Sequence, residues 1–162
     1  DSRSSVEVKS VRFHPAAEAL DAGAGAFDPP LLIAQNDITQ PALLMDAQDR
    51  ATALYMHGGK ITASRNLGAG WTAPVTLDAA LGFAAALDAQ GNVVLASYGA
   101  PSVVRRIAAV GTTWSDPVQT GFTFTQGGPK LAAIAFDGAG DPVVFAKQPV
   151  GTRSGAEAVV CK

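Results

Sequence analysis

The strongest constraint on this chain is an internal repeat. Residues 43–77 and 85–120 are two copies of one pattern, and a third copy begins at residue 131. The turn residues Asp46 and Asp88 lie 42 positions apart, and each copy is built of short apolar runs separated by turns. A period of this length is typical of propeller blades, which bury their faces only against neighbouring blades. The sequence therefore predicts an all-β fold, a β-propeller or partial propeller built of four-stranded antiparallel blades.

The first copy contains the turn and edge-strand residues expected of a four-stranded unit. Asp46 begins a turn, because an aspartate side chain accepts hydrogen bonds from backbone amides two residues on. Gly58-Gly59 supplies positive φ for a two-residue hairpin. Pro74 has no N–H to donate, so the fourth strand is predicted to lie at an edge. The predicted strands of this copy are residues 43–45, 51–57, 60–66 and 71–77.

The later copies follow the same order, but the third is shorter. After the turn at Asp88, strands are predicted at residues 92–98, 102–108 and 114–120. The third copy is predicted to hold strands at 131–136, 142–147 and 156–161, with no fourth strand.

Residues 1–40 do not fit the repeat and are predicted to form an N-terminal strand with an irregular segment. Val6–Phe13 alternates with period two and is predicted to be a strand, as is 31–34, with a connector at 36–40. Because the third copy lacks one strand, we hypothesise that Val6–Phe13 completes it. Residues 41–162 then hold two complete blades and a truncated third.

Three units are fewer than the roughly four to eight blades of closed propellers. Three solutions stay open. Two chains of three units each form a six-bladed ring, residues 1–40 add a divergent blade, or the sequence is a piece of a longer protein. We expect self-association or a longer chain.

Composition excludes several classes of function. The chain has 12 basic and 14 acidic residues, a net charge of −2, and no basic stripe, which argues against binding nucleic acid. Its one basic pair, Arg105–Arg106, is expected to be solvated. No apolar run approaches the ~20 residues of a membrane span. The lone Cys161 excludes an internal disulfide, and the start at Asp1 fits removal of a signal peptide or a fragment.

Several motifs resemble those of a known superfamily. The turn Asp88–Asn92, the strand Ile61–Arg65 and the segments Gly70–Pro74 and Trp114–Pro117 are similar to the blades of bacterial secreted and surface propellers of the sialidase-like, Asp-box-related type. The resemblance covers about residues 41–162. It implies a propeller, a secreted or cell-surface location in a bacterium, and relatives that include lectin-like binders and enzyme-associated modules. The strict Asp box is absent, as is the arginine triad with the tyrosine nucleophile and acid that a sialidase needs.

No catalytic residue, metal ligand or cofactor is predicted. The chain has only two histidines, His14 and His57, whereas metal sites draw several ligands into one cluster. The aspartate pairs 46/49 and 137/141 are expected to stabilise their own turns rather than bind calcium. We therefore lean against an enzyme.

Four residues are candidates for ligand binding. Trp71 and Trp114, 43 positions apart, present planar indoles suited to sugar faces or a partner, although their place also suits packing against a neighbouring blade. Arg65 and Arg106 either bridge blades or line a groove between them. The prediction is a non-catalytic extracellular recognition or scaffold module, with carbohydrate in grooves between blades as the leading ligand. The alternative is a fragment or subunit of a propeller hydrolase completed by another segment or chain.

Overall fold

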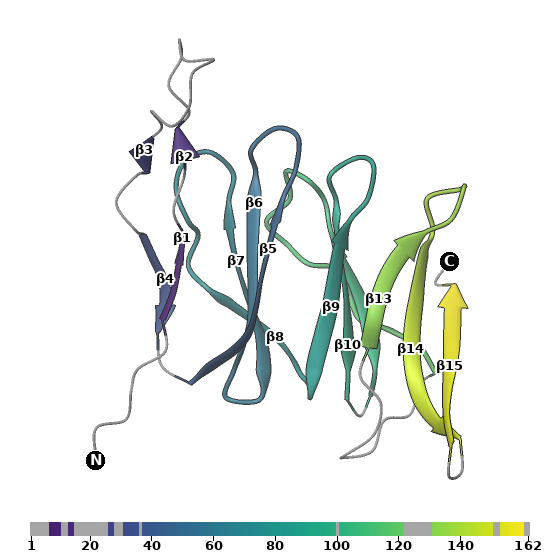
Figure 1. The fold of residues 1–162 in the computed structure, drawn as a ribbon. Helices are drawn as coiled ribbons and strands as arrows, with labels where there is room; N and C mark the ends of the chain where they lie inside the picture. The colour runs from purple at the N-terminus through teal and green to yellow at the C-terminus, as the bar shows by residue number, and fades with distance from the viewer. Residues whose placement is uncertain are drawn as a thin grey trace, which may run out of the picture. The chain divides into compact units, whose positions relative to one another are not determined.

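The structure is all-β in every part of the chain that it describes. The computed structural model describes residues 7–10, 13–14, 26–27, 31–35, 37–99, 101–121, 131–150 and 153–160 (Figure 1). Within these ranges the regular structure consists of antiparallel strands, with no helix. The chain divides into two units, Asp1–Ile38 and Thr39–Lys162.

The first unit contains two short strand pairs. β1 (Glu7–Ser10) pairs antiparallel with β4 (Leu31–Gln35), which confirms the predicted strand at 31–34. β2 (Phe13–His14) pairs with β3 (Ala26–Phe27). The hypothesis that Val6–Phe13 completes the third copy is wrong for a single chain, because Glu7–Ser10 pairs with β4 and Phe13 pairs with β3 instead.

The second unit consists of three antiparallel sheets, one for each copy of the repeat. The strands of the first sheet lie in the order β5-β6-β7-β8, those of the second in the order β9-β10-β11-β12, and those of the third in the order β13-β14-β15. The four-stranded antiparallel units are thus confirmed, and so are the three strands of the third copy within the described residues. No closed ring is seen in the described part of the chain, and the propeller stays a prediction. The strands are β5 (Ile38–Met45), β6 (Ala51–His57), β7 (Lys60–Asn66), β8 (Val75–Ala79), β9 (Gly82–Leu87), β10 (Val93–Tyr98), β11 (Val103–Ile107), β12 (Val118–Gln119), β13 (Leu131–Phe136), β14 (Pro142–Val150) and β15 (Arg153–Val160).

Most predicted strands are confirmed, and the two exceptions have physical causes. β8 and β12 begin after Pro74 and Pro117, so the predicted starts at Trp71 and Trp114 were wrong. Both strands nevertheless lie at sheet edges, as the prolines predicted. The predicted connector at 36–40 was also wrong over 38–40, where β5 has already begun.

The turn after the first strand of each sheet has the same geometry in all three copies. In each turn the aspartate Oδ1 accepts backbone N–H groups two and four residues on, at 2.8 to 3.0 Å. The third residue after the aspartate has positive φ: 58° at Asp49, 80° at Gly91 and 84° at Gly140. The repeat in sequence is therefore a repeat in structure, and the turn aspartates act as predicted.

Successive sheets pack face to face through two apolar contacts. The first seam joins the sheet of β5–β8 to that of β9–β12, and the second seam joins β9–β12 to β13–β15. β10 is buried along its whole length because its alternating side chains enter both seams, which explains its nearly continuous apolar sequence. The buried residues of the first seam are Leu54, Met56, Ile61, Ala63, Val93, Leu95 and Ile107. Those of the second are Val94, Ala96, Tyr98, Val104 and Val144.

Candidate functional site

The first tryptophan motif forms a corner at the edge of the first sheet. Trp71 makes an isolated antiparallel bridge with Asn66. The next residue, Thr72, donates its backbone N–H to the Arg65 carbonyl at 2.7 Å, and its Oγ1 accepts the Arg65 N–H at 3.0 Å. The Thr72 hydroxyl thus takes the place of a strand partner, which explains why β8 begins only after Pro74.

The second tryptophan motif repeats this corner in the second sheet. Ser115 donates its N–H to the Arg106 carbonyl at 2.8 Å, and its Oγ accepts the Arg106 N–H at 3.0 Å. Trp114 itself is half-buried and packs against the first seam. The shared W-[ST]-x-P sequence therefore encodes a corner that begins an edge strand, and each corner carries one half-buried indole.

Arg65 crosses the first seam. Its side chain is buried, with 5% of the residue exposed. Nε donates to Thr52 Oγ1 at 3.1 Å, Nη2 donates to the Ala109 carbonyl at 3.0 Å, and Nη1 donates to the carbonyls of Ala108 and Gly111. The guanidinium of the first sheet therefore holds the loop between β11 and β12 of the second. This is the blade-bridging role that the sequence offered for Arg65, whereas its role in ligand binding stays a prediction.

The loop that receives Arg65 is itself held by a turn of the repeat. Asn92 Oδ1 accepts the N–H of Ala109 at 2.9 Å, and Asn92 Nδ2 donates to Asp88 Oδ2 at 2.7 Å. The Asp88–Asn92 motif thus fixes the carbonyls to which Arg65 donates. Burial lowers the pKa of Arg65, the nearby charge of Arg50 lowers it further, and Asp46 opposes both.

Arg106 has a different environment, although it holds the matching position. Arg106 pairs in register with Val94, and Arg65 pairs in register with Thr52. Val94 and Thr52 each stand six residues after the turn aspartate of their copy. The side chain of Arg106 is exposed. Strand alternation places it on the same face as Val104, which belongs to the second seam. The structure therefore brings Arg65 and Trp114 to the first seam, and it places Arg106 on the side of the second.

An ion pair that the sequence did not indicate also closes the first seam. Arg105 of β11 donates from Nε and Nη2 to the two carboxylate oxygens of Asp78 in β8, at 2.7 and 2.8 Å. Its Nη1 donates to the Ser115 carbonyl at 2.7 Å. The expectation that Arg105 is simply solvated was wrong, and its hydrogen bonds to Asp78 raise its pKa. Asp78 lies one residue beyond the fourth strand predicted for the first copy, and nothing in the sequence pattern paired it with Arg105.

Asp46 lies at the end of the first seam where the turns meet. Its carboxylate accepts Arg50 Nε at 2.6 Å, and its side chain is only 4% exposed. A Cβ added at Gly91 of the second sheet would lie 3.1 Å from Asp46 Oδ2, so the two turns are in contact. Burial acts to raise the pKa of Asp46, but hydrogen bonds from Arg50 and Gln48 outweigh it and hold the pKa below its usual value.

Groups of three or more histidine, cysteine or carboxylate side chains that could hold a metal are not found within the described ranges. His57 is exposed beside the Gly58-Gly59 hairpin, and the side chain of His14 lies outside the described residues, as does Cys161. Likewise, none of the described segments is a helix with the length and apolar character of a membrane span.

Comparison with known proteins identifies no family, so any functional assignment rests on the site described above. No protein-family model matches the chain, and neither does any curated protein sequence.

Proposed function

We propose that this chain is a non-catalytic extracellular recognition or scaffold module whose three sheets are propeller blades, and that it binds carbohydrate beside its tryptophan corners. One observation carries the proposal: two successive sheets present a half-buried indole at the same backbone corner. A partly exposed ring on a hydrogen-bonded backbone corner offers an apolar platform that suits the face of a sugar.

The residues around the corners supply the polar part of such a site. Thr72, Ser115 and Asp116 are exposed. Arg106 is exposed too; its carbonyl accepts the Ser115 N–H, and its N–H donates to Ser115 Oγ. Sugar hydroxyls need donors and acceptors beside an apolar platform, and these side chains provide both. In this proposal the backbone of Arg65 positions the first corner through its hydrogen bonds with Thr72. Its guanidinium binds the β11–β12 loop across the first seam.

The test is glycan binding by four variants. Trp71→Ala and Trp114→Ala are expected to weaken saturable binding on an array and in titration at least about tenfold, since an aromatic platform contributes on the order of 1.5 kcal/mol or more. Trp71→Phe and Trp114→Phe should retain part of it. Because Trp114 packs against the first seam, thermal unfolding must be measured in parallel. Flat responses from the unmodified chain on arrays and in titration would contradict the proposal.

A further inference from the structure

Each copy of the repeat carries two apolar residues just before its turn aspartate. In the second copy these are Ala85 and Leu87, which pack into the first seam. In the third they are Ile134 and Phe136, which pack into the second seam. β13, which carries the latter pair, contacts β9 and β10. The first strand of a sheet therefore forms the seam with the preceding sheet.

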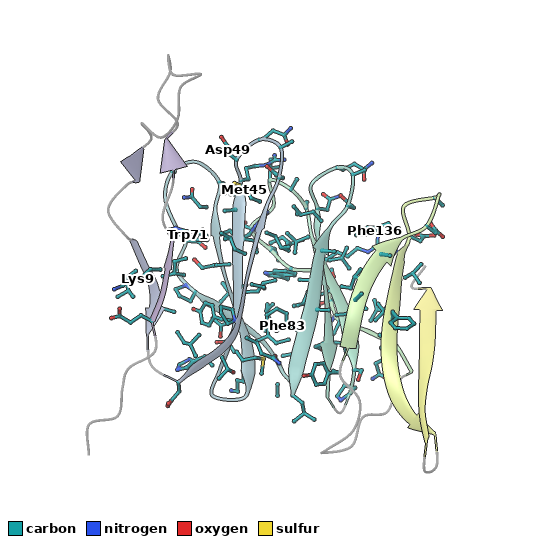
Figure 2. The ribbon with its side chains drawn as sticks, in the orientation of Figure 1. Lys9, Met45, Asp49, Trp71, Phe83 and Phe136 are labelled. Atoms are coloured by element: carbon teal, nitrogen blue, oxygen red, sulfur yellow. The ribbon has the colours of Figure 1, made fainter. Side chains whose placement is uncertain are left out.

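The corresponding residues of the first copy are exposed. Leu43 and Met45 stand three and one positions before Asp46, on β5, and they are 54% and 52% exposed. Met45 and Phe136 occupy the same place at the ends of β5 and β13 (Figure 2). On this side of the first sheet the side chains of β6 are buried, so the open apolar surface runs along β5. We call Leu43 and Met45 the β5 patch.

The third sheet presents the complementary surface. Val143 and Phe145 stand six and eight residues after Asp137, as Val94 and Ala96 do after Asp88. In the second sheet this face receives β13, and Val94 and Ala96 are 1% and 0% exposed. In the third sheet Phe145 is 42% exposed, and within the described residues no sheet covers it. The neighbouring side chains of β13 on this face, Ala133 and Ala135, are exposed as well. We call these four residues, Ala133, Ala135, Val143 and Phe145, the β14 patch.

We propose that a second copy of this chain docks its β5 patch on the β14 patch, so that β5 packs against the third sheet of its neighbour as β13 packs against β9 and β10 within the chain. The first-strand positions that form both seams within the chain are apolar in β5. The second-strand position, seven residues after the turn aspartate, is Ala53 in the first sheet, and it is already buried in the single chain, so the contact is confined to β5. The described residues of the two patches carry no charge, and a net charge of −2 offers little repulsion between copies. The proposal is independent of glycan binding.

This contact joins two different surfaces, so it is head-to-tail. Such contacts form rings where the rotation between copies closes and open chains where it does not. If one variant has a blocked β5 patch and another has a blocked β14 patch, a mixture of the two still contains one intact β5 patch and one intact β14 patch that can bind each other. A symmetric contact, in which one patch binds the same patch of a second copy, would not be restored by mixing the variants.

The experiment is sedimentation of the 162-residue chain and three variants, each checked for folding by circular dichroism. The unmodified chain should associate as its concentration rises. Met45→Asp and Phe145→Asp should each weaken association at least about tenfold, because each leaves a carboxylate in an apolar contact. Val118→Asp is the matched control, since Val118 is 56% exposed on an edge strand outside both patches, and it should behave as the unmodified chain. Leu43→Asp replaces Met45→Asp should that variant not fold.

The decisive sample is an equimolar mixture of Met45→Asp and Phe145→Asp. It should contain a one-to-one complex that neither variant forms alone. A monomeric unmodified chain at several hundred micromolar would overturn the proposal, and would favour cover by another protein or by further segments of a longer chain. Association of Phe145→Asp alone, at the affinity of the unmodified chain, would overturn it in favour of a symmetric contact.

Discussion

The two seams of this protein share one backbone frame but are closed in different ways. Apolar side chains fill both seams. The first seam is also crossed by two arginines in opposite directions, Arg65 to the β11–β12 loop and Arg105 to Asp78. In the second seam the register places Val159 where Arg105 stands, because Val144 pairs with Val159 as Leu95 pairs with Arg105.

The difference shows what a repeat conserves and what it leaves variable. Alternation and turn geometry fix which face each residue occupies, and these are common to the three copies. The polar groups at the rim of a seam differ from copy to copy. Buried charges of this kind add specificity of register more surely than stability, because desolvation offsets much of their attraction. We infer that the first seam is both more selective and more sensitive to mutation than the second.

The largest expected effect is that of Arg65→Ala. This change removes the guanidinium that donates hydrogen bonds to Thr52 Oγ1 and to the carbonyls of Ala108, Ala109 and Gly111. It also leaves a cavity in the seam. We expect the free energy of unfolding in urea to fall by roughly 3 kcal/mol. Arg65→Lys should recover little of it, since an ammonium cannot reproduce the planar fork.

Arg106→Ala is the matched control for this change. Arg106 holds the equivalent position but is exposed, so its loss should cost less than about 0.5 kcal/mol. Equal effects of the two substitutions would remove the distinction between the seams.

The second prediction concerns acid stability. Because the pKa of Asp46 is lowered in the folded state, its carboxylate stabilises the fold above about pH 4, and this contribution disappears as pH falls through the folded pKa. Asp46→Asn should therefore cost about 1.5 kcal/mol at pH 7, and the gap to the unmodified chain should narrow below about pH 4.

The same substitution in the third turn is the comparison. Asp137 accepts the same two backbone N–H groups but has Asp141 where Arg50 stands. Asp137→Asn should cost less at pH 7. A larger effect there than at Asp46 would show that the arginine contributes nothing to the first turn.

A smaller effect is expected from a methyl group at the glycine of each turn. Gly91 and Gly140 have φ values of 80° and 84°, so alanine costs about 1 kcal/mol of strain at either. At Gly91 the new Cβ would also lie 3.1 Å from Asp46 Oδ2 and 3.3 Å from Arg50 Nη2, whereas at Gly140 nothing lies within 4 Å. Thermal unfolding should show Gly91→Ala to be the more destabilising by about 1 kcal/mol. The reverse order would mean that the first and second turns are not in contact.

Local signals in the sequence predicted the frame correctly. The bounds of β6, β7 and β13 follow from apolar runs between turn residues, and Gly58-Gly59 has the positive φ values, 57° and 73°, that its hairpin requires. Edge placement followed from Pro74 and Pro117 because a missing N–H is a property of one residue. The starts of β8 and β12 were missed because a hydroxyl, on Thr72 or Ser115, substitutes for a strand partner.

The closure of the first seam could not be predicted in this way. Arg65 donates to backbone carbonyls 43 to 46 residues further along the chain. Because every residue has a backbone carbonyl, the sequence does not indicate which carbonyls accept these hydrogen bonds. Arg105 and Asp78 are 27 residues apart and meet only because two sheets stack. For the same reason Arg65 and Arg106 looked equivalent until the residues opposite them were known.

Native-state hydrogen exchange tests most directly the inference that the first seam, which depends on Arg65, is more sensitive to mutation than the second. We predict that the amides of β6 and β7 exchange only on global unfolding, whereas those of β13 and β14 exchange through a partial opening of lower free energy. Arg65→Ala should bring the two groups to similar free energies. Equal protection of both groups in the unmodified chain, or slower exchange in β13 and β14, would contradict the account.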